Sequence, residues 1–140
     1  MTGLETVLEY LTNVPAWYLS TTDADNPEQP HVRPFSFAAI EDGKLWFSTS
    51  VDKDVYRELC ANPHFEACSW WVGCGWLILS GTVDMTDTAS ERVRQEGFEH
   101  MLSIGEHHDS PNDGRLTFFS LASATARIDN IDGSREWIEL

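Results

Sequence analysis

Lysine is nearly absent from this chain, which has only Lys44 and Lys53 among its 140 residues. Asp and Glu number 23 against nine Lys and Arg, which gives a formal net charge of −14 at pH 7. Proteins that bind nucleic acid neutralise phosphates with a surplus of basic side chains, so this balance argues against a nucleic-acid partner. Both lysines fall within residues 32–63, which marks that stretch as one that uses positive charge.

Long apolar runs and targeting segments are also lacking. No run of eighteen apolar residues occurs, so no membrane-spanning segment and no membrane partner are expected. The N-terminus has no basic region followed by an apolar block, the pattern of a secretory signal. The expectation is a cytoplasmic protein that forms a single domain over residues 1–140, a length that suffices for a buried core.

Cysteine is sparse and irregularly spaced. The three residues, Cys60, Cys68 and Cys74, are an odd number, and a disulfide framework is not expected in a reducing compartment. They form no C-x-x-C pair, and His64 is the only histidine near them, whereas structural zinc sites usually contain a tight ligand pair. The sequence therefore predicts free, buried thiols and no metal site.

The elements that are present predict a mainly β (α+β) protein. Helical periodicity and capping patterns predict helices over 3–12, 53–61 and 89–102, with caps at Thr2, Asp52 and Thr88. Alternating apolar and β-branched segments predict strands over 17–22, 31–40, 44–49, 65–72, 76–85, 116–128 and 136–140. Antiparallel strands with few long crossovers favour a barrel, because a barrel leaves no exposed sheet edge.

Within residues 32–63, the groups suited to a phosphate follow one another along predicted elements. Arg33 lies on one strand, hydroxyl side chains end the next, and Lys53 begins a helix whose free N–H groups favour an anion. Asp52 and Asp54 flank the lysine and would repel phosphate unless they face solvent or cap the helix. The acidic residues between 91 and 106 are interpreted as a solvated face.

Four segments stand out by their order and spacing: Val32–Phe37 (VRPFSF), Gly43–Ser50 (GKLWFSTS), Lys53–Leu59 with Asn62-Pro63 (KDVYREL, NP), and Trp76–Val83 (WLILSGTV). Together they resemble the pyridoxamine 5′-phosphate oxidase-like, FMN-binding split β-barrel family, in particular its short bacterial members. The resemblance covers essentially the whole chain.

This resemblance implies a six-stranded antiparallel split β-barrel with flanking short helices that binds FMN at a homodimer interface. It places the FMN phosphate between Arg33 and Lys53, and it places the partner subunit's Trp76 over the flavin ring. The cofactor-binding residues that it implies are Arg33, Pro34, Phe35, Ser36, Ser48, Thr49, Ser50, Lys53 and Trp76.

The function implied is an FMN-binding oxidoreductase that acts on an unidentified small molecule, with a nicotinamide or another small molecule as electron donor. True pyridoxamine-phosphate oxidases carry basic and histidine residues near the C-terminus, whereas Arg135 is the only basic residue after Arg127 here, so that activity is not predicted. No residue is assigned as catalytic. The alternatives are a non-catalytic flavin-binding or flavin-sensing protein, and a split barrel that binds haem or deazaflavin.

Overall fold

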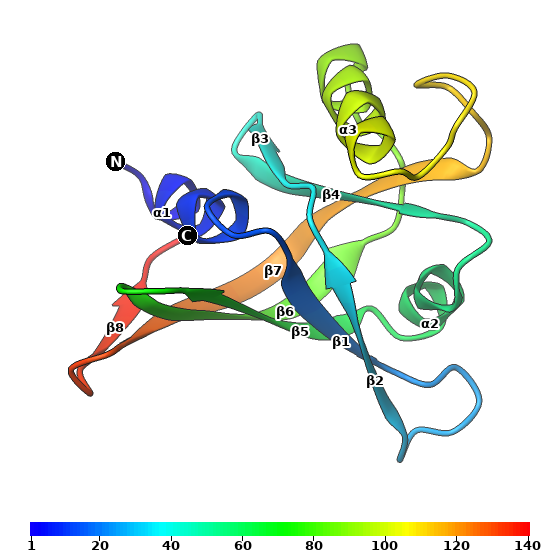
Figure 1. Cartoon of the computed structure of the whole chain (residues 1–140). Helices are drawn as coiled ribbons and strands as arrows, with labels where there is room; N and C mark the ends of the chain where they lie inside the picture. The colour runs from blue at the N-terminus through cyan, green and yellow to red at the C-terminus, as the bar shows by residue number, and fades with distance from the viewer.

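The computed structural model describes the whole chain, residues 1–140, as three helices and a sheet of eight strands (Figure 1). The helices are α1 (Gly3–Thr12), α2 (Asp54–Ala61) and α3 (Glu91–Ser103). None of them is long and apolar enough to cross a membrane. The strands are β1 (Trp17–Thr22), β2 (Pro30–Phe35), β3 (Ala39–Glu41), β4 (Lys44–Ser50), β5 (His64–Trp71), β6 (Gly75–Asp84), β7 (Leu116–Asn130) and β8 (Arg135–Ile138).

The sheet is curled but not closed by hydrogen bonds. Its strand order is β2-β1-β5-β6-β7-β4-β3, and β8 pairs with β7. The long strand β7 pairs with β4 over residues 116–120 and with β6 over residues 120–130, so it joins the two halves of the sheet. The two end strands, β2 and β3, are consecutive in the chain, and only the segment Ser36–Ala38, here called the seam, connects them. The expected split β-barrel is confirmed.

The prediction of one strand over residues 31–40 is wrong, because the chain leaves the sheet at the seam and β2 and β3 lie at opposite ends of the sheet. Pro34, which has no N–H to donate, lies on the end strand β2, where that loss costs least. This break raises the number of strands from the seven predicted by periodicity to eight, whereas the resemblance implied a barrel of six.

The predicted N-terminal cap is found at α1, whereas a different residue caps α3. In α1, Thr2 Oγ1 accepts a hydrogen bond from the Glu5 N–H at 3.1 Å, and a Glu5 carboxylate oxygen accepts one from the Thr2 N–H at 2.8 Å. In α3, the cap is Ser90, whose Oγ accepts from the Val93 N–H at 3.2 Å, and the expected cap at Thr88 is wrong. The α3 helix therefore begins two residues later than expected.

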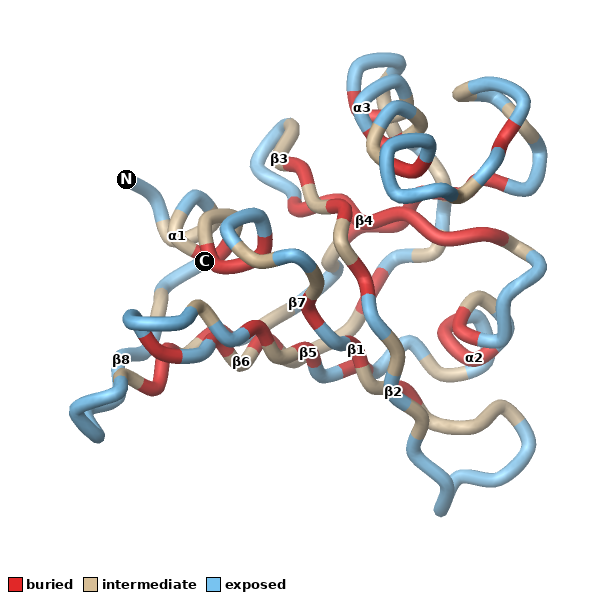
Figure 2. The backbone as a smooth tube through the Cα atoms, in the orientation of Figure 1, coloured by how far each residue is buried: buried red, intermediate tan, exposed pale blue.

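Two apolar cores hold the elements together (Figure 2). The larger fills the curled sheet, where Phe47 lies between Trp17 and Phe119 with ring centroids 4.7 and 5.6 Å apart. The smaller lies between α3 and the sheet and includes Phe118. Gly97 permits this second contact, since a Cβ atom at that position would overlap the Phe118 ring. The close approach of α3 brings its C-terminal end, and the loop after it, to the barrel seam.

The three cysteines are free, as expected, but the expectation that they are buried is wrong for two of them. Cys60 and Cys74 are exposed, and only Cys68 is partly buried. Burial raises the pKa of the Cys68 thiol, and the nearby Glu66 carboxylate raises it further.

Candidate functional site

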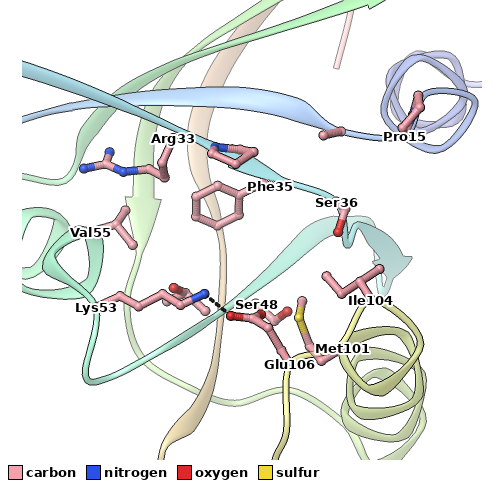
Figure 3. Close-up of a pocket in the computed structure, with 13 residues that line it drawn as sticks. Pro15, Arg33, Phe35, Ser36, Ser48, Lys53, Val55, Met101, Ile104 and Glu106 are labelled. Carbon is pink, nitrogen blue, oxygen red and sulfur yellow. Dashed lines mark hydrogen bonds and ion pairs between the residues drawn. The ribbon is translucent and has the colours of Figure 1, made fainter.

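A cavity of about 320 Å³ opens at the seam, where no strand bridges β2 and β4 (Figure 3). Residues of β2, the seam, β4 and the start of α2 line one side, and the end of α3 with the loop after it lines the other. Seven of the nine residues expected to bind a cofactor line this cavity: Arg33, Pro34, Phe35, Ser36, Ser48, Thr49 and Lys53. The lining residues that the sequence did not indicate are Pro15, Ala16, Val55, Met101, Ile104 and Glu106.

Lys53 provides the cationic end of the cavity. It is the N-cap residue of α2, and no side chain caps the free N–H groups of that helix. The Nζ atom of Lys53 forms an ion pair with Oε1 of Glu106, a residue that the sequence suggested was solvated (Figure 3). The two side chains remain 48% and 36% exposed, so breaking the pair costs only about 0–1 kcal/mol.

The acidic residues beside Lys53 lie outside the cavity. Asp52 is exposed and 3.9 Å from an Arg115 nitrogen, and it is not the helix cap that the sequence predicted. Asp54 is exposed in the first turn of α2. The carboxylate that opposes an anion in this cavity is therefore that of Glu106, which lies on a loop more than fifty residues away in sequence.

Arg33 also lines the cavity, but its guanidinium is already engaged. One terminal nitrogen lies 2.5 Å from Oε1 of Glu58, and the other donates to Thr21 Oγ1 at 2.7 Å. Figure 3 shows the guanidinium turned away from Ser36. Glu58 is a buried residue of α2 that sequence reasoning missed, although it falls three residues after Val55 on the buried face of the helix.

The hydroxyl of Ser48 has no hydrogen-bond partner. Ser48 lies on β4, lines the cavity and is only 2% exposed. Buried hydroxyl groups in proteins nearly always have a partner, and an unpaired one carries a free-energy penalty. A ligand with a polar atom inside the cavity would supply the partner that the protein does not.

The opposite end of the cavity is largely apolar. Phe35 of β2, together with Met101 and Ile104 near the end of α3, presents hydrocarbon surface there (Figure 3). One polar pair, formed by Ser36 and His100, lies at this end, with Ser36 Oγ 2.8 Å from His100 Nε2. The cavity thus combines an apolar end with a cationic end, an arrangement suited to an apolar ring that carries an anionic tail.

The two remaining predicted residues lie elsewhere. Ser50 follows Thr49 on β4, is buried and does not line the cavity. Trp76 lies on the outer side of the sheet opposite Trp70 of β5, and both contribute to an exposed apolar surface with Cys68 and Ile131. Trp70 is 65% exposed and Trp76 is 38% exposed. Exposed aromatic clusters of this kind are typical of protein–protein contacts.

Comparison with known sequences decides the family. A sequence model of the family described as pyridoxamine 5′-phosphate oxidase matches residues 4–128. The chain belongs to the pyridoxamine 5′-phosphate oxidase family. The match extends from α1 to near the end of β7 and so includes the seam and every residue that lines the cavity. No sequence among the curated proteins matches the chain.

Solved structures agree with this family fold. A NimC/NimA family protein from Clostridium acetobutylicum is 26% identical, with a TM-score of 0.83 over 99% of this chain and 92% of that one. A pyridoxamine 5′-phosphate oxidase-related, FMN-binding protein from Nostoc punctiforme is 12% identical, with a TM-score of 0.60 over 97% and 91%. A haem-binding protein from Mycobacterium smegmatis is 10% identical, with a TM-score of 0.63 over 92% and 55%. The last two share the fold alone.

Proposed function

We propose that the protein is a cytoplasmic, homodimeric, FMN-binding oxidoreductase that acts on a small molecule and holds its flavin in the cavity at the seam. The observation that carries this proposal is the unpaired Ser48 hydroxyl, in a cavity that is apolar at one end and carries Lys53 at the other. Membership of the pyridoxamine 5′-phosphate oxidase family, and the structural likeness to an FMN-binding protein from Nostoc punctiforme, support the choice of flavin.

The phosphate is proposed to lie at the Lys53 end. There the ammonium group, the hydroxyl of Thr49 and the free N–H groups at the start of α2 offer donors to an anion. Glu106 would have to release Lys53, which costs little because the pair is half-exposed. Arg33 is assigned a supporting role, since its guanidinium is held by Glu58 and Thr21.

The flavin ring is proposed to lie at the apolar end, against Phe35, Met101 and Ile104. Bound FMN would supply two-electron chemistry, while the protein supplies binding, orientation and exclusion of water. The Ser36 hydroxyl lines this end and is hydrogen-bonded to His100, so the pair holds an exchangeable proton beside the proposed ring position.

The proposed dimer follows from the size of the cavity. Its volume of about 320 Å³ is at the lower end of the range of about 300–1,000 Å³ for ligand pockets, which bury most of a ligand's surface. One subunit would therefore leave part of a flavin in contact with solvent. The exposed surface around Trp70 and Trp76 is the proposed contact with a second subunit, and Trp76 of the partner subunit is the proposed cover for the ring.

The first test is the absorption spectrum of the freshly purified protein, with mass identification of any released ligand. Bands near those of free flavin, and release of FMN, are the expected result. A haem Soret band in place of flavin bands would contradict the proposal. Reduction of the bound flavin by NADH, NADPH or another donor then separates an oxidoreductase from a protein that only holds the flavin.

The second test uses the two lysines as a matched pair. Lys53→Met should weaken FMN binding by about 10–100-fold, the loss expected for a charge-assisted hydrogen bond of about 1.5–3 kcal/mol, and it should leave riboflavin binding almost unchanged. Lys44→Met should change neither, because Lys44 does not line the cavity. Equal losses for FMN and riboflavin would refute the placement of the phosphate. Arg33→Ala is a poorer test, since it would leave the buried Glu58 carboxylate without its cation.

A further inference from the structure

A second hollow, of about 490 Å³, lies between the β1–β2 hairpin and α2, next to the cavity. Three of its side chains able to ligate a metal ion, Asp23, His31 and Glu58, lie together, and one ligand atom from each lies within 4.8 Å of the other two. The His31 Nε2 atom is 2.8 Å from Asp23 Oδ1 and 3.8 Å from Glu58 Oε2. Three separate parts of the chain therefore converge on one point: the turn after β1, the strand β2, and α2.

The carboxylate of Asp23 is held by one oxygen and presents the other. Its Oδ2 atom accepts hydrogen bonds from the backbone N–H groups of Asp25 at 3.0 Å and Asn26 at 2.9 Å. These bonds fix the side chain within the turn, so that Oδ1 faces His31. The tight turn thus orients the carboxylate before any ligand is bound.

The carboxylate of Glu58 is likewise held through one of its two oxygens. Its Oε1 atom accepts hydrogen bonds from Thr21 Oγ1 at 2.6 Å and from Arg33 at 2.5 Å. Its Oε2 atom makes no hydrogen bond, because His31 Nε2 at 3.8 Å is too far away, although the side chain is only 4% exposed. Glu58 lines the hollow, so this second oxygen is available there to a cation.

We propose that Asp23, His31 and Glu58 bind a divalent first-row transition-metal ion of the zinc or manganese type. Imidazole and carboxylate are the ligands that such ions take, at metal–ligand distances of about 2.0–2.2 Å. Ligand atoms around one such ion are separated by about 3–4 Å, close to the spacing found here. Thr21, Arg33 and the turn N–H groups act as the outer partners that orient metal-binding carboxylates.

With three protein ligands, the ion keeps coordination positions open to the hollow. Of the two Glu58 carboxylate oxygens, Arg33 contacts only Oε1. The Glu58 carboxylate would therefore bridge the Arg33 guanidinium and the metal ion. The metal site does not depend on the proposed flavin site, since none of its three ligands lines the cavity at the seam.

The test is a titration of the chelator-treated protein with Co²⁺ alone, followed by the visible absorption of the bound ion. One ion per chain is expected, without the near-ultraviolet thiolate-to-cobalt band that binding at the exposed Cys60 or Cys74 would produce. Loss of even an outer partner of a metal ligand typically weakens binding by about 10–100-fold. His31→Gln, which removes a ligand from a partly exposed position, should therefore weaken binding by about 100-fold or more.

The matched control is His107→Gln, which removes the histidine of a similar histidine–aspartate pair. His107 Nε2 lies 3.1 Å from Asp109 Oδ1 on an exposed loop, and no third ligand joins it, so this change should have no effect. Asp23→Asn is the second variant and should reproduce the loss caused by His31→Gln. Absence of Co²⁺ binding, a thiolate band, or binding unaffected by both variants would each overturn the proposal, whether or not the protein binds FMN.

Discussion

Replacing Ser48 by alanine should stabilise the ligand-free protein and weaken flavin binding at the same time. The Ser48 hydroxyl is buried and unpaired, and an unsatisfied buried polar group costs about 1–3 kcal/mol. Alanine removes the hydroxyl and leaves almost no void. The midpoint of thermal unfolding should therefore rise by about 3–10 °C for a chain of this length. Loss of one hydrogen bond to the ligand, worth about 0.5–1.5 kcal/mol, should weaken FMN binding by about 2–10-fold.

The control is Ser69→Ala, which changes the same residue type at an equally buried position. Ser69 is fully buried on β5, and its hydroxyl donates a hydrogen bond to the backbone carbonyl of Tyr10. Alanine at that position leaves the carbonyl unpaired, so the ligand-free protein should lose about 1–3 kcal/mol of unfolding free energy. The two serine variants should thus move stability in opposite directions.

Two assays decide the outcome. Urea unfolding of the flavin-free protein measures the change in stability, and quenching of flavin fluorescence during titration measures the change in affinity. If Ser48→Ala destabilises the ligand-free protein as much as Ser69→Ala does, the hydroxyl is not the unpaired group described above. If FMN affinity is unchanged, the Ser48 hydroxyl does not contact the flavin.

Three further outcomes are expected. Gly97→Ala should lower the unfolding free energy by about 1–3 kcal/mol, because the new methyl group overlaps the Phe118 ring, and an unchanged urea midpoint would contradict the packing of α3 on the sheet. Hydrogen bonds, first from the Arg115 backbone N–H, lower the pKa of Asp113 to about 2, below its ordinary value. The ionised Asp113 carboxylate therefore stabilises the folded protein fully above about pH 4, and this stabilisation disappears as the pH falls through 2. Asp113→Asn should lower the melting temperature at pH 7 but not at pH 2, whereas equal losses at both would refute this. A thiol reagent at pH 8 should label two cysteines quickly and Cys68 slowly, since burial raises the pKa of Cys68; three equal rates would contradict that assignment.

Several residues that line the cavity are close together in the sequence, which explains why they could be predicted to lie near one another. Ser48 and Thr49 lie near the end of β4, and Lys53 follows within a few residues at the start of α2. A strand that leads directly into a helix places its last side chains near the helix N-terminus in any fold that keeps the two elements. The local pattern of apolar residues and turns was therefore sufficient to group Thr49 with Lys53, whereas Ser48 was implied by the resemblance to the family.

The partners of the charged groups could not be anticipated in the same way. Glu106 reaches Lys53 only because α3 packs against the sheet and brings the following loop to the seam. Glu58 holds Arg33 because α2 packs against β1, the neighbour of β2, and no spacing in the sequence relates these residues. Whether an arginine faces a ligand or a buried carboxylate depends on such long-range contacts.

The sequence by itself determined the strands, the helices and the order of the segments around residues 32–63, because hydrophobic periodicity and turn residues act over short distances. Only the tertiary structure decided that residues 31–40 form two strands at opposite ends of the sheet, with a cavity at the seam between them. It also decided which carboxylates face Lys53, Arg33 and His31. The physical reason is that sheet curvature and helix packing bring together groups that no local pattern in the chain connects.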